Sequence, residues 1–291
     1  MTEAVTKADD STASRSPMLA RESLRRLIRK RFKASGLTIV QVAERCGISV
    51  SAADRWLKGE KRYSERDVRD LCAALDGDEE FTARIRQLAK DANKRNIAEP
   101  MDWAGPSDFL LFVEFEQAAT SVWTYETSLV PGVLQTPAYA EIVIRDTVSD
   151  DRIVSHRVDL RMQRQQIIQR ADSPTQFTAV IDESVLHRRP ANRAVMVEQL
   201  QHLLMLGSLP NVTLRVIPFA AGPLPIGSIG AFTVMRVPEL GHVAYGENPA
   251  VMTLLETGTA KYTETAHRLE GHALGTVESA RIIESALSEM G

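Results

Sequence analysis

Residues 37–64 constrain the fold more than any other part of the chain, because they predict two short helices that follow each other closely. A hydroxyl residue precedes each helix and a glycine follows it: Thr38 and Gly47 bound 39–46, and Ser49 and Gly59 bound 50–58. Hydroxyl side chains are favoured at helix N-caps, and glycine is favoured where a helix ends in a left-handed residue. The segment therefore predicts two capped helices joined by a tight turn.

The residues inside this segment fit a helix-turn-helix. That motif needs a small residue in the first helix, a glycine at the turn and apolar anchors on the inner face of the second helix. These positions are held by Ala43, Gly47, Ile48, Ala53 and Trp56. The two helices can therefore cross at close range.

With Thr38, Ala43, Gly47, Ser49 and Gly59 at these spacings, the segment resembles the helix-turn-helix of the Cro/repressor (XRE) family. The resemblance implies a sequence-specific, DNA-binding transcriptional regulator whose recognition helix is 50–58. It implies that the base edges are read by Val50, Ser51 and Arg55. Valine can contact a thymine methyl group, serine can donate or accept, and arginine matches guanine O6 and N7.

Phosphate contacts are expected around the recognition helix, from Thr38, Gln41, Ser49, Lys58, Lys61 and Arg62. Two departures from the family pattern stand out. Ile39 replaces a glutamine that braces the DNA backbone in many members, so we expect that contact to be missing. An apolar pair, Phe32 and Leu57, replaces an arginine–glutamate pair, an exchange that need not cost stability.

The charge is unevenly distributed. Residues 1–98 carry 21 Lys+Arg against 15 Asp+Glu, whereas residues 99–291 carry 14 against 23, so a segment of about +6 precedes one of about −9. A basic head suits a polyanionic partner, although solvated charged surfaces explain the same numbers. The basic run of the first helix, from Arg25 to Lys33, is open to the same two interpretations.

The chain divides into a tail, two domains and a linker. Residues 1–17 are rich in Thr, Ser, Ala and Asp and are expected to be a flexible tail. Residues 18–98 hold five short helical patterns and form the helix-turn-helix domain. Residues 99–106, with two prolines and a glycine, are the linker, and 107–291 form the second domain.

The second domain mixes helical and strand patterns. Helices are expected over 109–122, 136–147, 149–170, 194–206 and 263–290, and strands over 177–181, 212–218, 231–237, 243–245 and 251–255. The predicted fold class is therefore α+β: an all-α Cro/repressor-type domain followed by a larger α+β domain with a mainly antiparallel sheet.

Four stretches carry a second resemblance: TYETSLVPGVLQTPAYAEIVIR from Thr124, RVDLRMQRQQIIQR from Arg157, AVIDESVLHRR from Ala179 and NVTLRVIPFAAG from Asn211. They are similar to the C-terminal domain of actinobacterial (Streptomyces-type) regulators with a WhiJ-like or Scr antitoxin-like domain. The resemblance implies control of development, secondary metabolism or stress, often with a small protein encoded next door.

The sequence does not favour catalysis or metal binding. Asp182, Glu183 and His187 lie close together, but no GxSxG, HExxH or P-loop pattern accompanies them. Among the six histidines no pair has the i, i+4 spacing that binds zinc from one helix face. We therefore expect no enzyme, no cofactor and no metal.

Two groups of side chains keep two interpretations each. Trp123, Tyr125, Tyr139, Phe219 and Phe232 could line a ligand pocket, but core packing is favoured. Arg161, Arg164 and Arg170 could form a basic stripe that docks an acidic partner, or a solvated helix face.

These patterns together predict a cytoplasmic homodimer that binds double-stranded DNA, while its second domain senses a small-molecule effector or binds a partner protein. No apolar run approaches the length of a membrane span. The alternative is an antitoxin-like interaction protein that sequesters a small, adjacently encoded partner and autoregulates its own operon.

Overall fold

The computed structural model describes residues 17–59, 61–94, 107–188, 193–224, 230–238, 240–248, 251–255 and 259–290. The chain divides into two compact units, residues 1–99 and 100–291. The predicted tail (1–17) lies outside the described residues except for Pro17, and the predicted linker (99–106) lies wholly outside them. Among the described helices none is long and apolar enough to cross a membrane.

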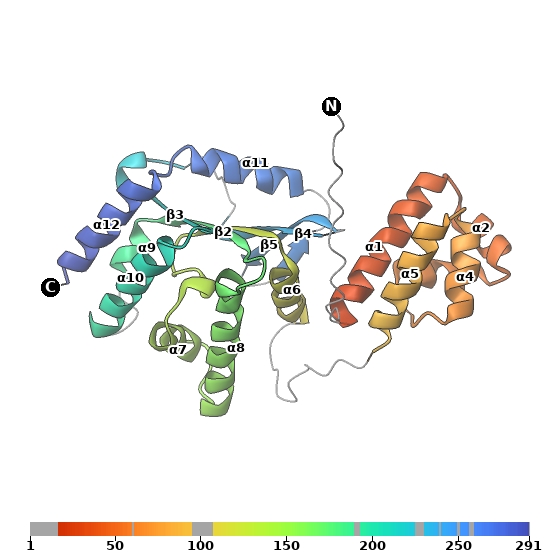
Figure 1. Cartoon of the computed structure of the whole chain (residues 1–291), viewed down its shortest axis with the longest axis horizontal. Coiled ribbons are helices and arrows are strands. Elements are labelled where there is room, and N and C mark those ends of the chain that lie inside the picture. The colour runs from red at the N-terminus through yellow and green to blue at the C-terminus, as the bar shows by residue number, and fades with distance from the viewer. Residues whose placement is uncertain are drawn as a thin grey trace. The chain divides into compact units, whose positions relative to one another are not determined.

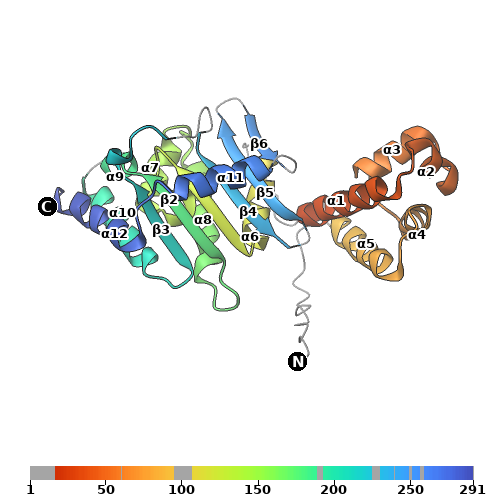
Figure 2. The same cartoon turned by 90° about the horizontal axis from the view of Figure 1, so that it is seen from above.

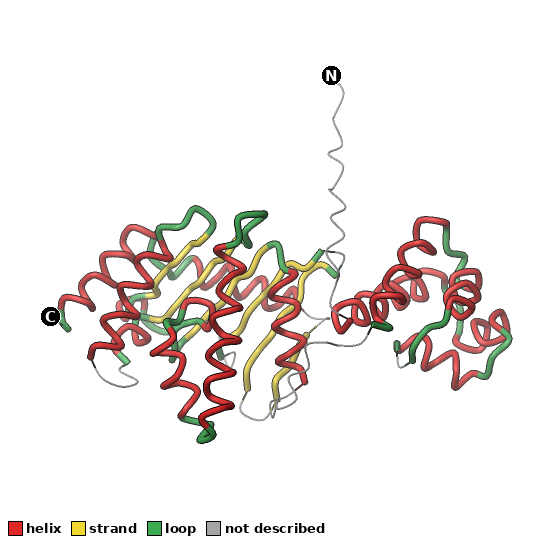
Figure 3. The backbone as a smooth tube through the Cα atoms, turned by 60° about the horizontal axis from the view of Figure 1, so that its bottom comes forward, coloured by secondary structure: helices red, strands yellow, loops and turns green. Residues whose placement is uncertain are grey.

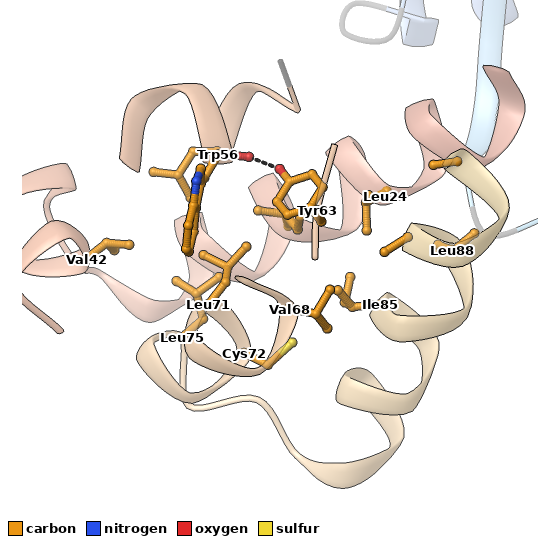
Figure 4. Close-up of a cluster of buried hydrophobic side chains, with 14 of the residues drawn as sticks. Leu24, Val42, Trp56, Tyr63, Val68, Leu71, Cys72, Leu75, Ile85 and Leu88 are labelled. Carbon is orange, nitrogen blue, oxygen red and sulfur yellow. Dashed lines mark hydrogen bonds between the residues drawn. The ribbon is translucent and has the colours of Figure 1, made fainter. Parts of the chain in front are cut away.

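The N-terminal unit consists of helices. Their bounds are α1 Pro17–Ser35, α2 Ile39–Cys46, α3 Val50–Lys58, α4 Glu65–Ala74 and α5 Glu79–Ala92. All of them enclose one apolar cluster, in which Leu24, Val42, Trp56, Leu71 and Ile85 are each at most 5% exposed (Figure 4). This core fixes α2 and α3, the pair that the capping pattern predicts.

The C-terminal unit is built on one six-stranded sheet of order β3-β2-β1-β4-β5-β6. The strands are β1 Ser121–Glu126, β2 Gln176–Asp182, β3 Val212–Ile217, β4 Phe232–Val237, β5 Gly241–Asn248 and β6 Val251–Leu255. β1, β2 and β3 are parallel, and β4, β5 and β6 continue the sheet in antiparallel pairings. The predicted α+β class is confirmed; the sheet is mixed, with three antiparallel and two parallel pairings, and Figure 3 shows the strands side by side.

Helices cover both faces of the sheet. Their bounds are α6 Ser107–Ala118, α7 Pro137–Arg145, α8 Asp151–Gln169, α9 Ser184–His187, α10 Arg193–Gly207, α11 Thr259–Glu270 and α12 Thr276–Ser288, with 3-10 turns η1 Gly132–Leu134 and η2 Phe219–Ala221. In Figures 1 and 2, α11 lies over one face, and α6, α7 and α8 lie on the other. Helices α7 and α8 lie in the crossover from β1 to β2, and α9 and α10 lie in the crossover from β2 to β3, as parallel strands require.

Two predicted helices of this unit are wrong. The helix expected over 109–122 ends at Ala118, and β1 begins at Ser121, because the β-branched and aromatic run Val122 to Tyr125 pairs with β2 and β4. The single helix expected over 263–290 is two helices, α11 and α12. Between these two helices, Leu274 donates its backbone N–H to Val216 O of the edge strand β3, at 2.9 Å. This hydrogen bond fixes the position at which the helix is interrupted.

Candidate nucleic-acid interface

Local hydrogen bonds set the ends of α2 and α3. Thr38 and Gln41 form a capping box: Gln41 N donates to Thr38 Oγ1 at 3.3 Å, and Thr38 N donates to Gln41 Oε1 at 2.8 Å. Ser49 Oγ accepts from Ala52 N at 3.2 Å. Gly47 and Gly59 end the helices with φ of 64° and 71°. Each cap is worth about 1 kcal/mol, so both helices are closed by their own sequence.

The inner face of α3 is held by the core. Ala53, Trp56 and Leu57 are at most 5% exposed. Tyr63 donates its hydroxyl to Trp56 O, and the two rings meet edge to face with centroids 6.5 Å apart (Figure 4). Burial, followed by the nearby Asp67 carboxylate, raises the pKa of Tyr63 well above its usual range, so this donor stays protonated. Phe32 packs against the same cluster as Leu57, the apolar pair that the sequence suggests.

The outer face of α3 carries the predicted base-reading residues. Val50 is 48% exposed, and Ser51 and Arg55 are exposed as well. No hydrogen bond or ion pair joins the Arg55 side chain to another described residue. A rigid helix thus presents a methyl-bearing side chain, a hydroxyl and a guanidinium, which are three of the groups that read base edges.

The predicted phosphate-binding residues differ in whether their side chains already make hydrogen bonds or ion pairs within the protein. Thr38, Gln41 and Ser49 are exposed but use their side chains as caps. Their helix N-termini still carry the positive end of the helix dipole. Lys58 Nζ pairs with Asp54 Oδ2 at 2.6 Å. Arg62 is exposed, and no ion pair joins it to another described residue.

Lys61 has a structural role that the sequence did not predict. Its Nζ lies 2.8 Å from Asp67 Oδ2 and 4.6 Å from the centroid of the Trp56 ring. Asp67 also accepts from Ser64 N at 2.8 Å, as the N3 residue of the capping box of α4. Burial alone would raise the pKa of Asp67, but the hydrogen bonds from Lys61 and Ser64 lower it. The Ser64-x-x-Asp67 spacing was the sequence signal for this cluster.

The basic run of α1 is only partly available to a partner. Arg25 and Arg26 both pair with Glu22, at 2.7 and 3.0 Å. By contrast, Arg29, Lys30 and Lys33 are exposed. Val40 of α2, 50% exposed, is a further apolar side chain that sequence reasoning did not select. No pattern marks it, because a single valine in a helix is ordinarily part of the core.

In the C-terminal unit both interpretations of the three arginines, a solvated helix face and a basic stripe, are wrong. Arg164 is buried and makes two hydrogen bonds to Glu116, from Nε at 2.7 Å and Nη2 at 3.0 Å. Arg161 donates to Gln135 Oε1 at 2.8 Å, and Arg170 donates to Ser173 O at 2.9 Å. Each of the three arginines therefore donates a hydrogen bond to an acceptor within the C-terminal domain.

The aromatic residues divide between core and surface. Tyr125, Tyr139 and Phe232 are at most 3% exposed, as core packing requires, whereas Phe219 is 61% exposed. Trp123 is half-buried and donates its indole N–H to Glu270 Oε1 of α11 at 2.8 Å. The described residues include no group of three or more His, Cys, Asp or Glu side chains able to hold a metal ion.

These observations define the class of protein. The N-terminal unit matches the helix-turn-helix domain model over residues 23–88, so the chain is a DNA-binding regulator. Residues 109–285 match the model described as a domain of unknown function, DUF5753, and the chain belongs to that family. No curated protein and no solved structure matches the chain.

Proposed function

We propose that this chain is a sequence-specific transcriptional regulator of the Cro/repressor (XRE) class, related to the WhiJ-like actinobacterial regulators. It acts in the cytoplasm as a homodimer on a short inverted repeat, with half-sites about 34–36 Å apart. The C-terminal domain supplies an input signal from an effector or a partner protein. The observation that carries the proposal is the outer face of α3, where Val50, Ser51 and Arg55 are exposed on a helix whose inner face is buried.

Dimerisation belongs to the proposal because one recognition helix contacts too few base pairs for specificity. Two helices double the base contacts and set the half-site spacing. The net charge of about +6 on residues 1–98 favours approach to DNA, and about −9 on the rest opposes contact elsewhere. Sedimentation of the full chain, free and with its selected DNA, measures the stoichiometry directly.

The test is binding-site selection from random duplex DNA by the full chain, followed by titration at several salt concentrations. Arg55→Ala should relax base preference at one position of each half-site and weaken the preferred site by about 5- to 150-fold, the range of about 1–3 kcal/mol. Arg62→Ala and Lys61→Ala should weaken all sequences alike and reduce the salt slope by about 1. Arg86→Ala in α5, an exposed residue of equal charge, is the matched control.

Two results decide the assignment. Equal loss on every sequence with Arg55→Ala would remove α3 as the reading helix. A stoichiometric small protein that co-purifies with the native chain, together with DNA binding confined to its own operon, would support the antitoxin-like alternative instead.

The proposal includes no catalytic step. Asp182 Oδ1 accepts from Ser184 N at 2.9 Å, and Glu183 Oε2 accepts from Phe219 N at 2.6 Å, so both carboxylates support turns of the backbone. His187 Nε2 lies 3.7 Å from Glu183 Oε1. We expect Asp182→Asn and His187→Ala to leave DNA affinity unchanged, as a titration of both variants would show.

A further inference from the structure

The C-terminal domain contains a cavity of about 180 Å³ between α6, α8 and the sheet, which we name the α6–α8 cavity. The segment from Val130 to Gln135, part of the VPG-LQT motif, forms one of its walls. Gly132 lets this wall approach Arg164, because a Cβ at Gly132 would lie 3.3 Å from Arg164 Nη1. Nothing in the DNA-binding role accounts for this arrangement.

The cavity has an aromatic wall and a polar floor. Phe112 and Tyr245 line it as a stacked pair with ring centroids 4.2 Å apart. Thr124 and Thr233 are cross-strand neighbours of β1 and β4 and also line it, 4% and 9% exposed. Aromatic side chains beside convergent polar groups are typical of the lining of a small-molecule site.

The floor leaves one hydrogen bond to be made. The hydroxyls of Thr124 and Thr233 lie 3.0 Å apart and bond to each other. One hydroxyl donates in that bond, so the proton of the other hydroxyl is not used in it, and no hydrogen bond from that proton joins another described residue. A buried donor without an acceptor costs about 1–3 kcal/mol, so this hydroxyl favours an acceptor in the cavity, supplied by solvent or by a ligand.

The wall also restricts the charge of the ligand. Arg161 and Arg164 line the cavity together with Glu116 and Glu126, so its formal charges cancel. An ionised ligand would lose its hydration without a surplus of opposite charge to replace it. A cavity of about 150 Å³ accepts benzene, so about 180 Å³ suits a single ring with small substituents.

We propose that the α6–α8 cavity binds a planar, uncharged, single-ring metabolite that carries a carbonyl or hydroxyl acceptor. The ring lies against the aromatic wall, and the acceptor receives the hydrogen bond from the threonine floor. The inference rests on the proposed function in one respect, since it names the site at which the C-terminal domain receives its input signal.

The test is ligand-observed NMR on the full chain with two sets of probes. Nicotinamide, uracil and phenol are uncharged and carry an acceptor, whereas nicotinate and benzamidine are charged rings of similar size. Leu129, 39% exposed, is the one exposed residue among those that line the cavity, so Leu129→Trp should close its mouth. Met205→Trp on α10, 49% exposed and outside the lining, is the matched control.

We expect at least one uncharged probe to bind, binding to be lost in Leu129→Trp and binding to be retained in Met205→Trp. The double variant Thr124→Val/Thr233→Val keeps side-chain shape and should weaken that probe about 2- to 10-fold, the worth of one hydrogen bond. Tighter binding of the charged probes, equal binding by both tryptophan variants, or no binding by any uncharged probe overturns the proposal.

DNA binding is titrated on the same preparations without probe. A chain that binds probes but no specific DNA refutes the proposed function and leaves the cavity assignment intact. The reverse result refutes the cavity assignment alone.

Discussion

Glu116→Ala should destabilise the C-terminal domain severely, because it leaves a guanidinium buried without its carboxylate. The Arg164 and Glu116 side chains are only 7% and 3% exposed, and two hydrogen bonds join them. Arg164 also lies over the rings of Phe109 and Phe112, at 5.4 and 5.2 Å, so it has no easy route to solvent. Removal of one partner of such a pair typically costs about 3–5 kcal/mol.

For a domain of this size, 1 kcal/mol lowers the Tm by about 2–4 °C, so Glu116→Ala should lower it by about 6–20 °C. The double variant Glu116→Leu/Arg164→Met removes both charges and keeps the volume, so its Tm should stay close to that of the native chain. Arg145→Ala breaks exposed ion pairs with Glu141 and Asp151 and serves as the control, with no shift expected.

The assay is differential scanning calorimetry of the full chain. Hydrogen exchange by peptide identifies the transition that belongs to residues 107–290. If Glu116→Ala and the double variant shift that transition equally, the cost comes from lost packing, and the reasoning about an uncompensated charge is refuted.

Three further outcomes are expected. Gly59→Ala should destabilise the N-terminal domain more than Gly47→Ala. Both variants lose about 1–2 kcal/mol because alanine must adopt a left-handed conformation, but of the two only Gly59 would place its Cβ 3.1 Å from Arg25. Equal denaturation midpoints of the two variants would contradict this. The pKa of Asp67 is depressed in the folded state, so the stabilisation by its carboxylate is present above pH 3.8 and is lost as the pH falls through the lower folded pKa. In urea titrations Asp67→Asn should therefore be less stable than the native chain at pH 7. The difference between the two chains should shrink below pH 3.8. Burial lowers the pKa of His202 from 6.5, so the unfolded state binds protons more readily than the folded state. The C-terminal domain should therefore lose stability as the pH falls below 6.5. If calorimetry gives a His202→Gln chain the same pH dependence, His202 is not the cause.

The helix-turn-helix could be predicted from the sequence because its signals are local. The bounds predicted for α2 and α3 are confirmed to the residue, since hydroxyl caps and closing glycines act within three or four positions. The same locality placed Val50, Ser51 and Arg55 on one helix. Whether they read bases stays a prediction, because the reading depends on a partner that the sequence does not contain.

The C-terminal domain was less predictable because its signals are distant. No glycine or proline marks the break between helix α6 and strand β1 in the sequence, and the pairing of β1 with β2 and β4 separates them. The positions of Arg161, Arg164 and Arg170 in the sequence suggest arginines on a helix surface. The partner of the buried Arg164 is Glu116, which lies 48 residues earlier. A periodic pattern shows which residues share a helix face but not what covers that face.

This difference has a functional consequence. The proposed DNA contacts all come from residues 38–62, a segment that its own caps and the N-terminal core hold in place. The α6–α8 cavity, by contrast, needs Phe112, Thr124, Arg164, Thr233 and Tyr245 from separate elements of the C-terminal unit. A substitution in the cavity can therefore change ligand binding without altering the residues that we propose contact DNA. The two proposed sites are built from different residues. DNA binding can therefore serve as the internal control when a cavity residue is substituted, and probe binding can serve as the control when a residue of α3 is substituted.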